Sequence, residues 1–283
     1  MSESLHSYMG FIFLRRDLKL LEKRPNINIS RNGVMPINNS NEYSGSLYRF
    51  RRWECDSVFA EDIIRNHRIY LSLASDNMDN DPNEFDTTIN MPENNYEGMS
   101  ISGDDSELDI INEWHEKDVI INQMVRDLVQ PILNEETLLC YFTGNYDIEY
   151  MWENYGDSYK GICIEFQNLN NYKGYGSFLP VRYVPEEDRQ INGSVAAELE
   201  RLAPENINTT LCATKDLSYQ NEREIRYVVS KCRVTPISGR YYLEFPRECI
   251  SRIFAGHSMC NGEFDRLQRM VEEYLPDTVI ERY

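Results

Sequence analysis

Residues 219–230 read Tyr-Gln-Asn-Glu-Arg-Glu-Ile-Arg-Tyr-Val-Val-Ser, and charged and apolar side chains alternate after Arg223. Successive side chains of a β-strand point to opposite faces. One face therefore carries the charged residues Glu222, Glu224 and Arg226. The other face carries the apolar residues Ile225, Tyr227 and Val229, which we expect to pack in the core. The stretch predicts a half-buried strand with two carboxylates on its polar face.

The polar face of this strand has two interpretations. If Glu222 and Glu224 face a cavity, they can divide the work of stabilising positive charge and orienting an acceptor group. The alternative is a solvated strand face with cross-strand ion pairs, which contribute little to stability. The strand alone does not separate these alternatives.

The same alternation predicts a sheet protein with interspersed helices. Further strands are predicted at residues 47–53, 69–73, 138–143, 161–166, 179–184, 241–245 and 250–255. Helices are predicted at residues 15–23, after the capping residue Ser57, within 108–132, at 194–204, and over the last segment with Phe264, Leu267, Val271 and Tyr274. Early strands, a helical middle and later strands indicate the α+β class, with mixed, largely antiparallel sheets and helical segments between them.

Composition divides the chain into an extension and one domain. Residues 25–45 are rich in Asn, Ser, Pro and Gly, so residues 1–45 are predicted to be an N-terminal extension and linker. Residues 46–283 are predicted to form a single α+β domain, catalytic in type. Within it, residues 76–106 carry mainly Asn, Asp, Glu, Pro, Gly and Ser, which predicts a mobile acidic surface loop.

The net charge of −18 bears on location and partners. An acidic surface repels phosphate backbones and anionic lipids at long range. No stretch approaches the roughly 20 apolar residues of a membrane helix, and the first residues lack a signal-peptide pattern. We therefore expect a cytoplasmic protein with no membrane partner. The arginines that could form a local basic groove are Arg49, Arg51, Arg52, Arg65 and Arg68.

Metal and phosphate-loop motifs are not found. The seven cysteines are scattered without a Cys-x-x-Cys pair, so neither a disulfide framework nor a structural zinc site is expected. The segment that starts at Asp79 has Glu84 and Asn90 where a calcium-binding EF-hand loop needs Gly and Glu. No glycine-rich phosphate loop and no nucleophile elbow occur. No metal site is predicted.

Aromatic residues mark a second candidate feature, Trp152-x-x-Tyr155, before the strand predicted at 161–166. Aromatic side chains on a turn that leads into a strand can form the wall of a pocket for a flat ligand. The alternative is that Trp152 and Tyr155 fill the core.

These segments together resemble one protein family. In chain order they are Tyr48-Arg49-Phe50-Arg51, Ile69-Tyr70-Leu71-Ser72, Asn80-Asp81-Pro82, Cys140-Tyr141-Phe142-Thr143, Met151-Trp152-x-x-Tyr155, Gly161–Phe166, Val181-Arg182-Tyr183, Lys215, Glu222-x-Glu224-x-Arg226 and Ile253–Gly256. From residue 47 to residue 257, the chain resembles the prokaryotic domain-of-unknown-function family numbered 2971. The order is also similar to that of ADP-ribosyltransferases, with a basic first strand, a serine-bearing second strand and a late Glu-x-Glu strand.

The second similarity implies an ADP-ribosyltransferase-like fold that uses NAD as a substrate. By this resemblance, Glu224 is the catalytic residue and Glu222 positions the acceptor. Arg49 holds the pyrophosphate of NAD through a bidentate contact. The further NAD-binding residues are Arg51, Tyr70 and Ser72, the last two in the nicotinamide–ribose pocket, with Trp152 or Tyr155 as stacking walls.

The resemblance implies a bacterial toxin or anti-phage defence effector. The expected partners are NAD, an unidentified macromolecular acceptor (protein or nucleic acid), and an antitoxin or regulatory protein. Two other function classes stay open. One is a non-catalytic binding or regulatory protein, and the other is a hydrolase or nuclease that uses the carboxylates with a metal.

Overall fold

The computed structural model describes residues 43–53, 58–77, 134–185 and 212–283. Several predictions fall outside these residues and are not compared with the structure. They concern most of the 1–45 extension, the capping residue Ser57, the 76–106 loop beyond residue 77, and the helices at 15–23, 108–132 and 194–204.

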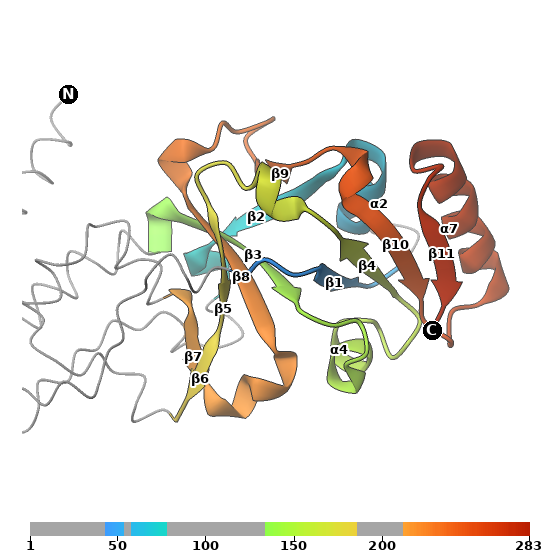
Figure 1. Cartoon of the computed structure of the whole chain (residues 1–283), viewed down its shortest axis with the longest axis horizontal. Coiled ribbons are helices and arrows are strands. Elements are labelled where there is room, and N and C mark those ends of the chain that lie inside the picture. Colours follow the sequence, from blue (N-terminus) through green and yellow to red (C-terminus); the bar gives the residue numbers. More distant parts are fainter. Residues whose placement is uncertain (1–42, 54–57, 78–133, 186–211) are drawn as a thin grey trace, which may run out of the picture.

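The described chain combines eleven strands with three α-helices and five short 3-10 helices (Figure 1). The strands are β1 (Leu47–Arg51), β2 (Arg68–Leu73), β3 (Thr137–Thr143), β4 (Ile162–Phe166), β5 (Ser177–Pro180), β6 (Arg182–Val184), β7 (Thr214–Asp216), β8 (Glu224–Ser230), β9 (Tyr241–Glu244), β10 (Ile250–Ala255) and β11 (Val279–Arg282). The helices are α2 (Val58–Asn66), η2 (Ala74–Asn77), α4 (Glu149–Asn154), η4 (Leu169–Tyr172), η6 (Leu217–Glu222), η7 (Lys231–Arg233), η8 (Arg247–Cys249) and α7 (Asn261–Tyr274).

Nine of the strands form one sheet in the order β11-β10-β4-β1-β3-β2-β9, and β8 extends it by pairing with both β3 and β5. The pairs are antiparallel except β10 with β11, which are parallel. Strands β6 and β7 form a separate parallel pair. The α+β class with mixed, largely antiparallel sheets is therefore confirmed.

Strand β3 is where the sheet forks. Along one edge it pairs with β8 over its whole length, from Thr137 to Thr143. Its other edge is shared, because β1 pairs with it only at Thr143 and β2 pairs with it only at Leu138 and Leu139. Between these contacts, β1 and β2 diverge from β3. The segment 140–142 therefore borders a gap in the sheet.

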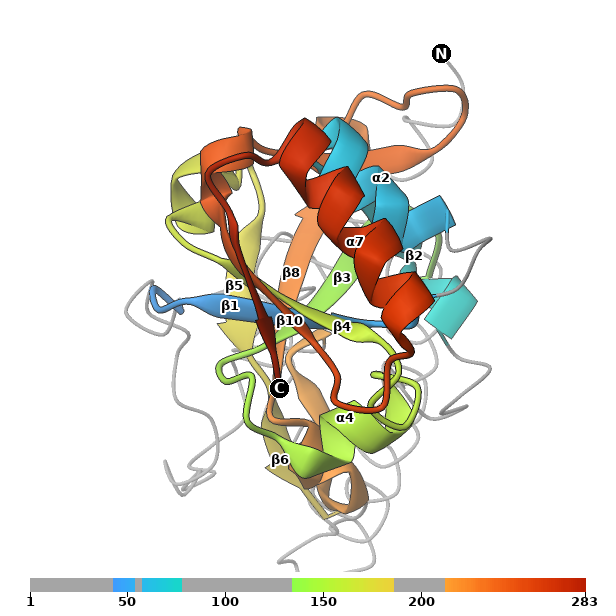
Figure 2. The same cartoon turned by 90° about the vertical axis from the view of Figure 1, so that its right-hand side faces the viewer.

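Two apolar clusters cover the two faces of the sheet. The larger cluster lies under α2 and α7, which are side by side (Figure 2). Helix α7 buries Leu267, Met270 and Val271, whose spacing places them on one side of a helix. The smaller cluster lies on the other face under α4 and includes Phe50 and Trp152.

The sequence missed or misassigned several elements. Helix α4 replaces the turn expected around Trp152, and the short strands β7 and β11 were not predicted. The strand predicted at 179–184 is two strands, β5 and β6, because Val181 bonds to the carbonyl of Glu224 whereas Arg182 bonds to that of Ala213. These differences depend on long-range pairing, which local propensity does not encode.

Candidate functional site

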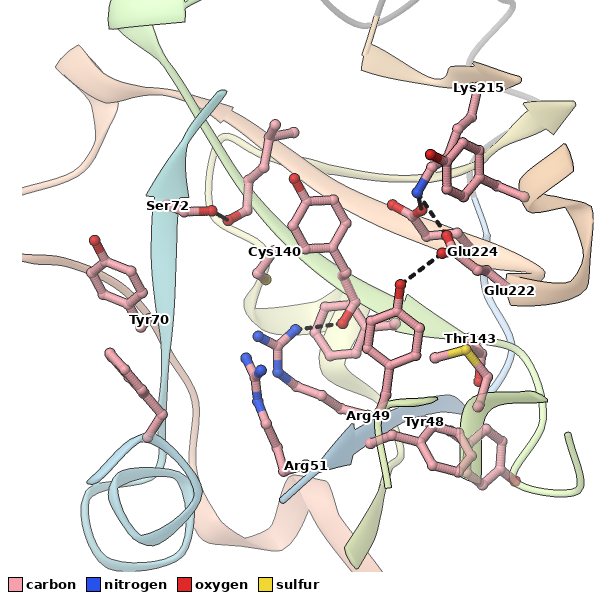
Figure 3. A pocket seen from close by; sticks show the side chains of 18 residues that line it. Tyr48, Arg49, Arg51, Tyr70, Ser72, Cys140, Thr143, Lys215, Glu222 and Glu224 are labelled. Carbon is pink, nitrogen blue, oxygen red and sulfur yellow. Dashed lines mark hydrogen bonds and ion pairs between the residues drawn. The ribbon is translucent and has the colours of Figure 1, made fainter. Parts of the chain in front are cut away.

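A cavity of about 380 Å³ opens at the fork in the sheet (Figure 3). Its walls come from β1, β2 and β3, which border the gap, from α2 and α4, and from β7, η6 and β8. Because β1 and β2 leave β3 here, side chains can reach the gap from both faces of the sheet. The fork thus gathers residues from segments that are far apart in the sequence.

Arg49 supplies the cationic side of the cavity. Its Nη1 donates a hydrogen bond to the Tyr141 carbonyl, in the segment of β3 that pairs with β8 but not with β1 or β2. The guanidinium lies over the Phe142 ring at 5.6 Å, and the residue is only 5% exposed. Burial lowers the pKa of Arg49, although arginine stays charged at neutral pH. Arg49 is therefore a desolvated cation in the wall of a cavity.

Neither Arg49 nor Arg51 is neutralised within the described part of the chain, since no ion pair joins them to a carboxylate there. The Nε atoms of both side chains are buried and have no hydrogen-bond partner among the described residues. A buried charge without a partner is costly, and a guanidinium fork fits carboxylate and phosphate groups. The pair is thus suited to an anionic ligand.

The opposite side of the cavity carries a carboxylate pair held by one ammonium. The Nζ of Lys215 lies 2.7 Å from Oε2 of Glu222 and 3.2 Å from Oε2 of Glu224. Lys215 also lies over the Tyr219 ring, 4.6 Å from its centroid. The hydroxyl of Tyr155 donates to Oε1 of Glu222 at 2.6 Å. The carboxylates are thereby fixed in the cavity wall (Figure 3).

Arg226 and Tyr183 hold Glu224 but not Glu222. The Nε of Arg226, which is completely buried, donates to Oε1 of Glu224 at 2.6 Å. Nη1 of the same guanidinium donates to the Cys212 carbonyl at 2.7 Å. The backbone N–H of Glu224 donates to the hydroxyl of Tyr183 at 2.7 Å. Both the backbone and the side chain of Glu224 are therefore held.

The two carboxylates differ in acidity. Burial raises the pKa of Glu222, and the opposing effects of Lys215 and Tyr155 do not cancel that increase. Burial also acts to raise the pKa of Glu224, but the charges of Arg226 and Lys215 outweigh it and lower the pKa. Pairs of titratable groups whose environments separate their pKa values are typical of acid–base sites. Glu224 is thus the more acidic carboxyl group of the pair, and Glu222 binds a proton more readily.

The position of Glu222 corrects the sequence interpretation in one respect. Glu222 is the last residue of η6, not part of the strand that begins at Glu224. Arg223, between them, has a left-handed backbone with φ 47°. The start of η6 is fixed by Asp216, which accepts a hydrogen bond from the N–H of Ser218. This turn, instead of a regular strand, brings both carboxylates to Lys215.

The cavity gathers most of the predicted site residues. Those in its wall are Arg49, Arg51, Tyr70, Ser72, Tyr155, Glu222 and Glu224. Trp152 is not among them, because it is completely buried and its indole ring stacks on Tyr283 at 4.7 Å. Its Nε1 donates to the Tyr146 carbonyl. Of the two aromatic walls expected, only Tyr155 reaches the cavity, since α4 turns Trp152 toward the smaller apolar cluster.

Sequence reasoning gave no role to several residues of the site. Lys215 belongs to the series of segments that resembles the family, yet its local sequence does not reveal that it bridges both glutamates. Arg226 was placed on the polar strand face, but its contact with Glu224 was not predicted. Tyr183 belongs to the same series of segments, but neither it nor Phe59 was given a role in the site.

Comparison with known proteins identifies a family for part of the chain. Residues 151–227 match the family described as protein of unknown function, DUF2971. This stretch includes Tyr155, Lys215, Glu222 and Glu224, and it confirms the family resemblance over that range. No curated protein and no solved structure matches the chain.

Two kinds of feature are absent from the described residues. They contain no group of three or more His, Cys, Asp or Glu side chains arranged to hold a metal ion. In the same part of the chain, no helix is long and apolar enough to cross a membrane.

Proposed function

We propose that this chain is an NAD-dependent ADP-ribosyltransferase that uses the cavity at the fork of the sheet. One observation carries the proposal: the guanidinium of Arg49, without a carboxylate partner in the described residues, and the Lys215-bridged carboxylates Glu222 and Glu224 line the same cavity. NAD combines an anionic pyrophosphate with a ribose that becomes cationic when nicotinamide leaves. The arginine side of the cavity suits the pyrophosphate, and the side with Glu222 and Glu224 suits the ribose on which positive charge develops.

The pyrophosphate binds on the cationic side. Arg49 keeps one nitrogen on the Tyr141 carbonyl, which fixes the guanidinium in the cavity wall, and no carboxylate of the described residues neutralises its charge. Arg51 adds a second guanidinium from the same strand. Charge-assisted hydrogen bonds between arginine and phosphate are short and strong, and they are stronger where water is excluded.

The glycosidic bond breaks on the anionic side. The bond between the ribose C1′ and the nicotinamide nitrogen breaks, and its electron pair leaves with nicotinamide. The remaining ribose carries oxocarbenium-like positive charge. Glu224 stays ionised because of Arg226 and Lys215, so a fixed anion faces the charge as it develops. Preorganised electrostatic stabilisation of this kind lowers the barrier without reorganisation during the reaction.

Glu222 completes the transfer. A nucleophilic oxygen or nitrogen of the acceptor forms the new bond to C1′ and must release a proton. Glu222, whose pKa burial raises, accepts that proton more readily than Glu224 does. The proposed acceptor is a macromolecule, protein or nucleic acid. The proposed setting is a toxin or defence effector that an antitoxin or regulatory protein controls.

The experiment is incubation with labelled NAD and cell extract, with release of nicotinamide and transfer of label both followed. Glu224→Gln is expected to reduce nicotinamide release about 10²–10³-fold, the usual effect of removing a preorganised group. Glu248→Gln is the matched control, since the Glu248 side chain is 69% exposed and pairs with Arg247 outside the cavity. A melting curve for each variant confirms folding.

Two results would exclude the proposal in favour of other classes. Absence of nicotinamide release and of label transfer in the wild-type protein indicates a non-catalytic binding protein. Hydrolysis of nucleic acid that a chelator abolishes indicates a metal-dependent nuclease.

A further inference from the structure

The cavity has an aromatic end that the proposed chemistry does not use. Phe59, in the first turn of α2, and Tyr70, on β2, both line it. Their ring centroids lie 5.3 Å apart with an interplanar angle of 40°. Phe59 is 46% exposed, so its ring is accessible to a ligand. An exposed aromatic wall within a cavity is suited to a flat ligand.

The support behind this wall is a further aromatic ring with a paired arginine over it. Tyr70 contacts the Tyr242 ring on β9 at 6.1 Å, edge to face. The guanidinium of Arg68 lies over the Tyr242 ring, 4.2 Å from its centroid. The same guanidinium donates two hydrogen bonds to the carboxylate of Asp62, which neutralises its charge. The wall therefore offers ring surface backed by a paired guanidinium, in contrast to Arg49 and Arg51 in the same cavity.

The order of groups along the cavity suggests one extended ligand. Figure 3 shows Tyr70 on one side of Arg49 and Arg51, and Glu222 and Glu224 on the other. On β3, the partner of Glu224 is Thr143 and the partner of Ser72, two residues after Tyr70 on β2, is Leu139, so Ser72 and Glu224 are offset by about 13 Å along the strand. A base and a ribose joined through a pyrophosphate span such a separation.

We propose that the wall formed by Phe59 and Tyr70 is the subsite for the adenine base of the dinucleotide. This inference rests on the proposed function and deepens it. It also moves Tyr70 away from the nicotinamide–ribose pocket that the sequence resemblance implied. The adenine stacks on the Phe59 ring, its pyrophosphate binds Arg49 and Arg51, and the nicotinamide ribose reaches the carboxylates. Stacking of a base on an aromatic side chain accepts any base but requires the aromatic ring.

The test compares the binding of ADP and of inorganic pyrophosphate by calorimetry. ADP carries both the base and the phosphates, so it is expected to bind more tightly than pyrophosphate. Phe59→Ala is expected to weaken ADP binding roughly 5- to 150-fold, the range for loss of one base–aromatic stack, and to leave pyrophosphate binding unchanged. Tyr172→Ala is the matched control, because Tyr172 is 45% exposed and does not line the cavity.

The outcomes separate this inference from the proposed function. If ADP and pyrophosphate bind wild type equally, or if Phe59→Ala leaves ADP binding unchanged, the adenine subsite is wrong even when NAD is cleaved. If ADP binding depends on Phe59 but wild type releases no nicotinamide, the subsite is supported and the transferase proposal fails. Unchanged pyrophosphate binding by Phe59→Ala shows that the variant has folded.

Discussion

Replacement of Tyr155 by Phe removes one hydroxyl and tests how the site sets the acidity of Glu222. The hydroxyl donates to Oε1 of Glu222 at 2.6 Å, and a donor to a carboxylate favours its ionised form. Without the donor, the pKa of Glu222, which burial already raises, increases further. Lys215 remains at 2.7 Å on the other carboxylate oxygen, so the site keeps its cation.

The size of this effect follows from the contact. A hydrogen bond to a charged group contributes about 1.5–3 kcal/mol. Tyr155 is 43% exposed, and water replaces part of the lost bond, so the lower end of that range applies. Since one pKa unit corresponds to about 1.4 kcal/mol, the pKa of Glu222 should rise by about one unit.

The assay is the pH dependence of the ADP-ribose transfer rate. Glu222 must be ionised to accept a proton, so activity falls as pH falls through its pKa. The acid limb of Tyr155→Phe should therefore lie about one pH unit higher than that of wild type. Tyr172→Phe is a matched control outside the cavity. An identical acid limb in Tyr155→Phe and wild type would refute the assignment of Glu222 as the base.

Three further predictions concern stability and are checked by denaturant unfolding. Arg226→Met leaves Glu224 buried without its main partner and should lower the free energy of unfolding by about 3–5 kcal/mol; a loss below about 1 kcal/mol would contradict this. Gly161→Ala places a methyl group against the carbonyl oxygen of Arg51 and should cost about 1–3 kcal/mol, whereas Gly262→Ala, with open space around it, serves as the control. Because the pKa of Glu224 is lowered on folding, its contribution is present above the usual glutamate pKa and is lost as pH falls from there through the lowered pKa of the folded state. Glu224→Gln should therefore show a smaller acid-side loss of stability than wild type.

The sequence predicts the strands of this fold well where the side chains on the two faces of a strand differ clearly in polarity. On β8, Ile225, Tyr227 and Val229 share one face, and all three lie in the larger core cluster. The opposite face, which carries Glu224 and Arg226, is buried as well, so the strand is not half-buried as its sequence predicts. Because successive side chains of a strand point to opposite faces, the sequence assigns each side chain to a face without knowledge of the neighbouring strands. Most other predicted strands differ from the observed ones by only one or two residues at their ends.

The fork in the sheet is not predictable from the same pattern. It exists because β1 and β2 share one edge of β3, and that pairing joins residues far apart in the chain. The position of Lys215 between Glu222 and Glu224 depends likewise on β7 lying beside η6. Trp152 was misplaced since an aromatic residue suits a core and a pocket wall equally well, and only the packing of α4 separates them.

The most direct measurement is a crystal structure of Glu224→Gln with NAD, because this variant should bind the dinucleotide but cleave it slowly. The account predicts the pyrophosphate within hydrogen-bonding distance of Arg49, the adenine on Phe59, and the nicotinamide ribose beside residue 224. A cavity that stays empty at saturating NAD, or NAD bound with its phosphates away from Arg49, would contradict it.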